Sequence, residues 1–202
     1  MLGLDKPKVL EEINSPYSGA VRVMKGYGYT YVTTGGWTQT GGVIEDVWKP
    51  VLKKVGKKDK TWLVLGLAGG TVAKVIAKSY RPMKIVGVEI DPEMVRIGKT
   101  YLGMDAIQKL EIITADANTV TFPEPFEYVL VDMYLGDKLP SFVYSDQFLR
   151  KLKKMGKVVV INHLFHEDWM KTKAQDLITK LKKNYSTITL MRVLTNIMII
   201  CA

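Results

Sequence analysis

A turn of small residues follows the apolar run WLVL, and it is the first place in the chain where a ligand could approach the backbone closely. The turn contains Gly66, Ala68, Gly69 and Gly70. In a sheet with helices on both faces, ligands commonly bind at such a turn, outside the carboxyl ends of the strands. Small residues also serve ordinary packing between a helix and a strand, so the turn alone leaves both interpretations open.

Acidic residues lie at the ends of the next three apolar runs. Glu89 ends the run VGVE, Asp116 follows EIITA, and Asp132 follows YVLV. An acid at the first of these positions can accept hydrogen bonds from both hydroxyls of a ribose, although a solvated carboxylate at a strand end is the alternative. Because parallel strands bring their carboxyl ends to one edge of a sheet, the four segments indicate a nucleoside-binding site at that edge.

The elements that must position these residues are short apolar runs that alternate with helical patterns, which is typical of a parallel sheet covered on both faces. The last two runs are too close together for a crossover helix, so they should pair as an antiparallel hairpin at the sheet edge. The expected fold class is α/β, a Rossmann-like doubly wound, mostly parallel seven-stranded sheet with an antiparallel edge strand. Strands are predicted at residues 62–65, 84–89, 110–114, 128–132, 157–162, 187–191 and 196–201, and helices at 43–55 and near 70–80, 92–102, 142–154 and 167–184.

The N-terminal part has a different pattern. Residues 17–34 alternate apolar and polar residues on both sides of the segment KGYG, which predicts a small β-hairpin. We therefore expect an N-terminal hairpin segment at residues 1–42 and a nucleoside-binding domain at residues 43–202. A hairpin that projects from a domain is a place where subunits could meet, so a homo-oligomer is one expectation.

The composition limits the class of protein. The formal net charge is +9, yet the lysine clusters lie where helices should end, and cations are favoured there. Nucleic acid stays open as an alternative partner. No apolar run has the length of a membrane span, the N-terminus lacks a secretory signal, and the single Cys201 cannot form an internal disulfide. We expect a cytoplasmic protein without membrane contact.

The segments GLAGGT, VEIDP, ADA and VDMY, preceded by a segment that contains GGWTQ, together resemble a known family. They are similar to the spermidine synthase (polyamine aminopropyltransferase) branch of the class I S-adenosylmethionine-dependent methyltransferase fold. The resemblance extends from Pro16 to Cys201.

The resemblance implies a role for each cofactor-binding candidate. It implies that the turn at residues 66–70 lies against the methionine part of the cofactor and that Glu89 binds the ribose. Asp116 and Ala117 would face the amino group of the adenine. Gln39 would touch the cofactor from the N-terminal side.

Asp132 matches the acid that accepts the proton of the attacking amine in that family, so we expect it to be the catalytic base. Positioning of the cofactor or capping of a helix is the alternative. His163 is a second candidate, for which a structural role is the alternative. Trp48 and Tyr134 could line an acceptor pocket, although aromatic residues at such spacing are more often core residues. No Cys/His cluster has the spacing of metal ligands, so no metal site is predicted.

Three elements of the polyamine synthase pattern are altered in this chain. Gly69 replaces an aspartate, and backbone N–H groups at a helix N-terminus can receive a carboxylate where that acid is missing. Leu135 replaces a second acid that helps to hold a diamine, and a Tyr-His pair is replaced by a segment that contains Trp48. These differences favour ordinary S-adenosylmethionine as the cofactor over its decarboxylated form.

We therefore expect an S-adenosylmethionine-binding group transferase, and more specifically a methyltransferase with a small-molecule acceptor. One alternative is an aminopropyltransferase that uses decarboxylated S-adenosylmethionine and an unusual amine. Another is a non-catalytic nucleoside-binding homologue. The sequence does not identify the acceptor.

Overall fold

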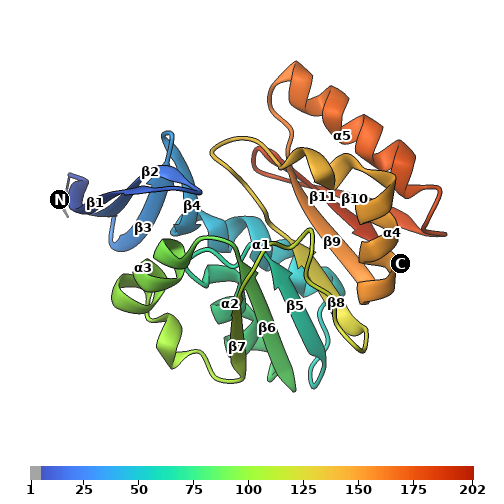
Figure 1. The fold of residues 1–202 in the computed structure, drawn as a ribbon, viewed down its shortest axis with the longest axis horizontal. Coiled ribbons are helices and arrows are strands. Elements are labelled where there is room, and N and C mark those ends of the chain that lie inside the picture. The colour runs from blue at the N-terminus through green and yellow to red at the C-terminus, as the bar shows by residue number, and fades with distance from the viewer. Residues whose placement is uncertain (1–5) are drawn as a thin grey trace.

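The computed structural model describes residues 6–202 and contains two sheets. A seven-stranded sheet forms the body of the molecule, and a four-stranded antiparallel sheet lies at one end of it (Figure 1). Residues 1–5, which belong to the predicted segment 1–42, lie outside the described residues.

The large sheet has the strand order β10-β11-β9-β8-β5-β6-β7. β11 (Asn196–Cys201) is antiparallel to both β9 and the edge strand β10 (Ile188–Val193). The predicted seven-stranded, mostly parallel sheet with an antiparallel edge is therefore confirmed, and the last strand of the chain lies one place in from the edge. The five neighbouring parallel strands are β5 (Thr61–Leu65), β6 (Lys84–Glu89), β7 (Leu110–Thr114), β8 (Phe126–Val131) and β9 (Gly156–Leu164).

Helices cover both faces of this sheet, which explains why its inner strands are buried along most of their length. Successive residues of β5 point to opposite faces: Trp62 packs in one core with α1 and α2, while Leu63 packs in the other with α4 and α5. The helices are α1 (Val43–Val55), α2 (Thr71–Tyr80), α3 (Pro92–Leu102), α4 (Asp146–Met155) and α5 (Asp168–Leu181), with short 3-10 helices η1 (Met104–Ala106) and η2 (Ser141–Tyr144).

One helix matches the expectation and another differs from it. α1 has the predicted bounds and continues through Pro50, although proline often ends or kinks a helix. The predicted helix at 142–154 is divided into η2 and α4, because Ser145 caps α4 by accepting a hydrogen bond from the backbone N–H of Phe148 at 3.2 Å. Among residues 6–202, no helix is long and apolar enough to cross a membrane.

The predicted N-terminal hairpin is present as β2 (Gly19–Gly26) and β3 (Tyr29–Thr34). Its turn residues, Tyr27 and Gly28, both have positive φ angles, as tight hairpin turns require. This hairpin forms the centre of a larger sheet, because β1 (Lys8–Ser15) and β4 (Trp37–Gly41) pair along its two edges. Neither flanking strand was predicted from the sequence.

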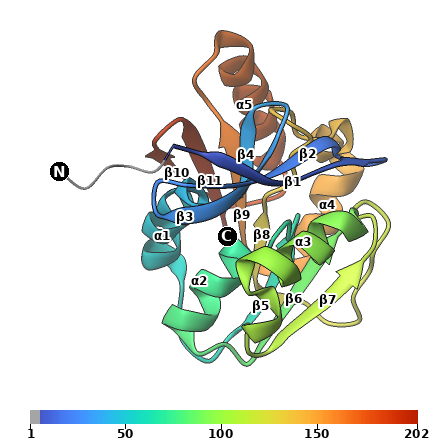
Figure 2. The same ribbon diagram turned by 90° about the vertical axis from the view of Figure 1, so that its left-hand side faces the viewer.

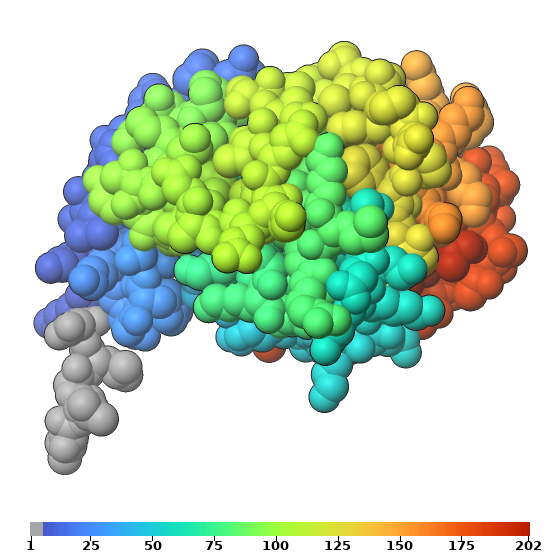
Figure 3. All heavy atoms as spheres, turned by 90° about the horizontal axis from the view of Figure 1, so that it is seen from below, coloured from blue at the N-terminus to red at the C-terminus, as the bar shows by residue number. Residues whose placement is uncertain are grey.

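The N-terminal sheet packs against the main domain through α3. Val23 and Val32 lie in one small core with Ile97, and the blue N-terminal sheet lies beside the yellow-green α3 in the space-filling view (Figure 3). The buried Asp91, which caps α3, accepts hydrogen bonds at 2.6 Å from the hydroxyls of Ser15 and Ser18. These contacts fix the small sheet across one end of the molecule (Figure 2).

Candidate functional site

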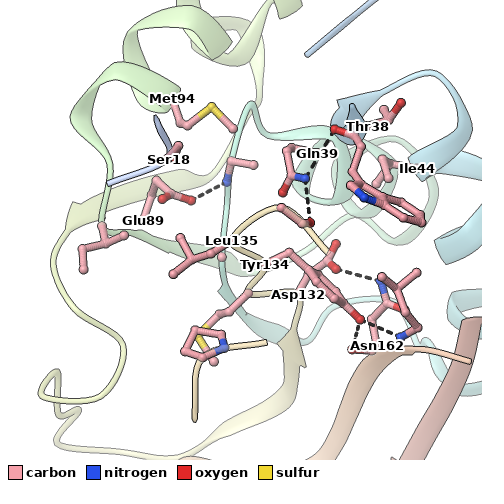
Figure 4. Close-up of a pocket in the computed structure, with 18 of the residues that line it drawn as sticks. Ser18, Thr38, Gln39, Ile44, Glu89, Met94, Asp132, Tyr134, Leu135 and Asn162 are labelled. Carbon is pink, nitrogen blue, oxygen red and sulfur yellow. Dashed lines mark hydrogen bonds between the residues drawn. The ribbon is translucent and has the colours of Figure 1, made fainter. Parts of the chain in front are cut away.

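A cavity of about 460 Å³ lies at the carboxyl ends of the parallel strands, within the size range of small-molecule sites. Its lining residues follow the order of the strands. Asn162 belongs to β9, Asp132 follows β8, Gly66 follows β5, Glu89 ends β6, and Asp116 follows β7. The four predicted segments therefore meet in one cavity, which extends across five neighbouring strands. Figure 4 shows Glu89 and Asp132 among the residues that line it.

The turn after β5 presents its backbone to the cavity through Gly66 and Ala68. Gly66 has a φ angle of 86°, and a Cβ atom there would collide with the backbone oxygen of Asp132, so this position requires glycine. Ala68 also has a positive φ angle, and its N–H donates a hydrogen bond of 2.7 Å to Glu89. The turn therefore forms a narrow cradle that a larger side chain would fill.

Gly69 and Gly70 face away from this cavity. A Cβ atom on Gly69 would collide with Leu102 and would lie 2.7 Å from Cγ2 of Thr40. A Cβ atom on Gly70 would lie 2.9 Å from the sulfur of Met104. The two residues let the turn pack closely against neighbouring elements, and they lie behind the cavity wall.

Glu89 is buried beside the turn, and both of its carboxylate oxygens have backbone partners. Oε2 accepts from the N–H of Ala68 at 2.7 Å and Oε1 from that of Asp91 at 3.0 Å. Burial raises the pKa of Glu89, while these donors act in the opposite direction. Each oxygen can accept a further hydrogen bond, so the group can still bind the two hydroxyls of a ribose.

Asp116 and Ala117 line the next part of the cavity, beyond β6. Asp116 Oδ1 accepts a hydrogen bond of 2.8 Å from the N–H of Asn118, which fixes the carboxylate at the start of the loop. An acceptor in this place suits an exocyclic amino group of a base.

Asp132 lies on the other side of the turn and is held by two side-chain donors. Trp48 Nε1 donates to Oδ2 at 2.7 Å. Asn162 Nδ2 donates to Oδ1 at 2.8 Å, as Figure 4 shows. Burial raises the pKa of Asp132, and the two hydrogen bonds oppose that effect. The result is an oriented carboxylate that can accept a proton or bind a cation.

Tyr134 and Asn162 support this carboxylate. Asn162 Oδ1 accepts from Asn196 Nδ2 at 2.7 Å, so a chain of amides leads from β11 to Asp132. The hydroxyl of Tyr134 donates to the backbone oxygen of Asn162 at 3.1 Å and accepts from the N–H of Leu164 at 2.8 Å. Burial raises the pKa of Tyr134 well above its usual value, so this residue contributes a neutral ring to the wall.

Trp48 and His163 do not line the cavity. Trp48 reaches Asp132 from the core beneath it, and His163 forms a hydrogen bond of 2.9 Å with the hydroxyl of Tyr144. Burial lowers the pKa of His163. Neighbouring residues of a strand point to opposite faces, so it is Asn162 that reaches the cavity.

Sequence reasoning missed Asn162 and Asn196. Asn162 ends the run KVVVIN, so the rule that identified the other strand-end residues would have added it as a candidate beside His163 without choosing between the two. The sequence offers no comparable signal for Asn196.

Gln39 closes the cavity from the side of the N-terminal sheet. Its Nε2 donates to the backbone oxygen of Gly136 at 3.1 Å and that of Trp37 at 3.4 Å. The bond to Gly136 connects β4 to the loop after β8. Two parts of the chain that are far apart in sequence therefore share one wall.

The cavity is acidic although the protein is basic. Glu89, Asp116 and Asp132 line it, and within residues 6–202 no lysine, arginine or histidine does so. The same part of the chain contains no group of three His, Cys, Asp or Glu side chains placed to hold a metal ion. Three carboxylates in a confined space favour a cationic ligand, and a sulfonium nucleoside with a ribose and an adenine fits this set of acceptors.

Comparison with known proteins identifies relatives of both the sequence and the fold. A polyamine aminopropyltransferase of Vibrio vulnificus is 25% identical over 103 residues, a match that covers 48% of this chain and 34% of that protein. The match therefore spans about a third of the length of the relative.

Solved structures show the fold relationship. The crystal structure of spermidine synthase from Thermotoga maritima superposes with a TM-score of 0.78 at 13% identity, covering 96% of this chain and 72% of that one. Human methyltransferase-like protein 13 in complex with SAH gives a TM-score of 0.58 at 20% identity, covering 75% of this chain and 74% of that one.

The model of the ubiE/COQ5 methyltransferase family matches residues 42–184, well over half of the chain. The match begins just before α1 and ends after α5, so it includes the turn and all three acids of the cavity. The chain therefore belongs to the ubiE/COQ5 methyltransferase family, and it has the spermidine-synthase-like form of the class I S-adenosylmethionine-dependent methyltransferase fold.

Proposed function

We propose that the protein is an S-adenosylmethionine-dependent methyltransferase that acts on a small-molecule acceptor. The membership of the ubiE/COQ5 methyltransferase family supports methyl transfer, and the acidic cavity at the strand ends supports a sulfonium nucleoside as the cofactor. Glu89 would bind the ribose, Asp116 and Ala117 the adenine, and Gly66 and Ala68 the methionine part, with Gln39 above it. The cofactor would supply a methyl group on a positively charged sulfur. The protein would align the acceptor, and Asp132 would accept its proton.

The choice of S-adenosylmethionine over its decarboxylated form rests on the side chains of the turn after β5. Gly66 and Ala68 face the cavity, while position 69 is closed off by Thr40 and Leu102. The turn therefore presents no acidic side chain that would repel the carboxylate of S-adenosylmethionine. Glu89, the nearest acid bonded to the turn, already accepts two backbone N–H groups.

Aminopropyl transfer is the second candidate. It is favoured by the similarity to the Vibrio vulnificus polyamine aminopropyltransferase and by the fold shared with spermidine synthase. Asp132 could accept a proton in either reaction. The two functions differ in the cofactor that they need, so cofactor preference separates them.

Calorimetric titration with S-adenosylmethionine and with its decarboxylated form tests the proposal. We expect S-adenosylmethionine to bind at least tenfold more tightly, which corresponds to about 1.4 kcal/mol. A tenfold preference for the decarboxylated form would instead establish the second candidate. Tight binding of S-adenosylmethionine without transfer to any acceptor would indicate a non-catalytic nucleoside-binding protein.

Glu89→Gln tests the position of the nucleoside. The substitution keeps the size of the side chain but removes its charge, so S-adenosylmethionine should bind about 1.5–3 kcal/mol more weakly, the range for a hydrogen bond to a charged group. Lys84→Gln is the matched control, because Lys84 begins the same strand and forms an ion pair with Glu111 away from the cavity. Equal affinities in the two variants would mean that Glu89 does not bind the ribose.

A further inference from the structure

The part of the cavity beside α1, β9 and β11, which we call the acceptor end, has one charged side chain. Asp132 is the only charged residue that lines this end among residues 6–202. Six apolar residues line it as well, and two of them, Val43 and Leu194, are exposed by 39% and 60% at the rim. The apolar wall consists of Trp37, Val43, Ile44, Val47, Leu164 and Leu194.

The neutral polar side chains beside Asp132, namely Tyr134, Asn162 and Asn196, already have partners within the protein. The Tyr134 hydroxyl both donates to and accepts from the backbone of β9. Asn162 and Asn196 are joined to each other, and Asn196 Oδ1 also accepts from the hydroxyl of Thr195 at 3.0 Å. Each oxygen of Asp132 accepts one hydrogen bond and can accept another. The acceptor end therefore offers a ligand one anionic anchor and an apolar surface.

We propose that the methyl acceptor is a monoamine whose nitrogen lies against Asp132 and whose apolar body extends along α1 toward Leu194. The inference rests on the methyltransferase function proposed above and names the class of substrate for the same cavity. A carboxylate with one fixed donor on each oxygen keeps acceptor capacity on both, which suits the N–H groups of an amine. An apolar body would gain free energy by covering the exposed side chains at the rim.

The reaction balances with an amine and with the groups present. The lone pair of a neutral amine forms a bond to the methyl carbon as the bond from that carbon to sulfur breaks, and the bonding pair stays on sulfur as a neutral thioether. An alkylamine enters as an ammonium ion beside Asp132, so transfer of one proton to this carboxylate has to free the lone pair before the attack. The methylated product is itself an ammonium ion, and Asp132 then releases the proton that it accepted to solvent. An aliphatic hydroxyl is a weaker nucleophile that needs a stronger base than a carboxylate, which makes an alcohol the poorer acceptor.

A diamine fits this end poorly. Its second ammonium group would lie against the apolar wall, which offers it no partner and removes part of its hydration. A polyanion is also disfavoured, because it would meet the Asp132 carboxylate with no compensating cation in the cavity. The first penalty acts against a diamine, which the polyamine aminopropyltransferase relatives would suggest. The second acts against a polyanion, which the positive net charge would suggest.

A matched series of ligands tests the proposal. Hexylamine, hexamethylenediamine and hexanol have the same carbon chain and differ only in their end groups. We would titrate each into the protein filled with S-adenosylhomocysteine and follow methyl transfer from S-adenosylmethionine by mass spectrometry. Hexylamine should bind at least tenfold more tightly than either analogue, and it alone should gain a methyl group. Equal or tighter binding of the diamine, or methylation of the alcohol, would overturn the proposal.

Leu194→Asp reverses the expected preference. Leu194 has a φ angle of 52°, a region that aspartate tolerates better than leucine, so the variant should fold. A second carboxylate at the far end should improve binding of the diamine at least tenfold, whereas hexylamine loses an apolar contact there and should bind no more tightly than before. Leu190→Asp is the control, since Leu190 is 48% exposed on β10 and does not line the cavity. If both variants respond alike, the apolar body does not lie along Leu194.

The two proposals fail in different ways. If S-adenosylmethionine does not bind, both the proposed methyltransferase function and the proposed class of acceptor are wrong. If it binds but none of the amines binds to the filled protein or is methylated, only the acceptor class is wrong. A nucleic acid or a hydroxylated compound that is methylated by the same protein would then identify the correct class.

Discussion

At the scale of single residues, Asp132 is controlled by two opposing effects. Burial favours its protonated form, whereas the donors Trp48 and Asn162 favour the carboxylate. A hydrogen bond to a charged group contributes about 1.5–3 kcal/mol, so the loss of either donor should change the pH range in which Asp132 acts as a base. The two donors come from α1 and β9, which are far apart in sequence.

Trp48→Phe should move the pH dependence of activity. The substitution removes one donor, so the pKa of Asp132 should rise further and kcat/KM should begin to fall at a higher pH on the acidic side. The break that arises from titration of the amine itself should not move. The measurement is the pH profile of kcat/KM for methylation of the best amine.

Trp62→Phe is the matched control for this change. Trp62 is an equally buried indole that stacks on Tyr128 with ring centroids 4.1 Å apart, and its Nε1 has no hydrogen-bond partner in the described part of the chain. It should alter stability without moving the acidic break. An unchanged profile in Trp48→Phe would show that the indole does not tune Asp132.

The sequence predicted which strand ends contribute residues to the site, but it did not predict at every end which residue faces the cavity. It predicted that Glu89, Asp116 and Asp132 would meet, and the structure brings them together, because parallel strands end at one edge. It predicted His163 as a candidate site residue, whereas the neighbouring residue Asn162 lines the cavity. Which of two adjacent residues faces a ligand depends on the strand register, and a run such as KVVVIN, buried on both faces, has no alternation that would reveal it.

At the scale of elements, the turn between β5 and α2 is the most tightly constrained connection in the site. Gly66 needs a positive φ angle and also has no room for a Cβ atom, because the backbone of Asp132 lies against it. The turn and the strand end that carries the base are thus in direct contact. A change in one must displace the other.

Gly66→Ala should therefore cost both stability and binding. A left-handed backbone alone costs an L-residue about 1–2 kcal/mol, and the collision with Asp132 adds to this. Gly103→Ala is the control, since Gly103 has a φ angle of 69° but nothing within 4 Å of an added Cβ atom. Chemical denaturation should show a clearly larger loss for Gly66→Ala, and only that variant should lose affinity for S-adenosylmethionine. Similar losses in both would mean that the close approach is relieved by small shifts.

The elements of the main domain could be predicted from the sequence, and those at its N-terminal end only in part. Apolar runs with no polar face identify the buried parallel strands, and β5 and β6 match the expectation closely. β1 was missed because its side chains are largely exposed, so its composition reflects solvent more than a core. β4 is five residues long and ends in glycine, which gives too little pattern to distinguish it from a loop.

At the scale of the whole molecule, the two sheets form one cavity. Tyr17, Trp37 and Gln39 from the N-terminal segment line it together with the strand ends of the large sheet. The predicted boundary between residues 42 and 43 therefore separates the strands of the two sheets, but residues on both sides of it line the cavity. A ligand in the cavity would contact both parts.

Ligand binding should stabilise both sheets together. With S-adenosylmethionine at one hundred times its Kd, the free energy of unfolding should rise by about 2.7 kcal/mol, which raises Tm by about 5–10 °C for a chain of this size. Hydrogen exchange should slow in β4 as well as at the ends of β5 and β6. Protection restricted to the large sheet would show that the N-terminal segment does not take part in binding.

The hydrogen bond from Trp48 to Asp132 has a consequence for observing the protein. The emission wavelength of an indole depends on the electric field across its rings, and here a carboxylate lies 2.7 Å from the indole nitrogen. Protonation of Asp132 would remove the negative charge from this place, so the emission maximum of Trp48 would shift as Asp132 titrates. In a variant that keeps Trp48 as its only tryptophan, the fluorescence spectrum would therefore report the protonation state of Asp132 at the acceptor end.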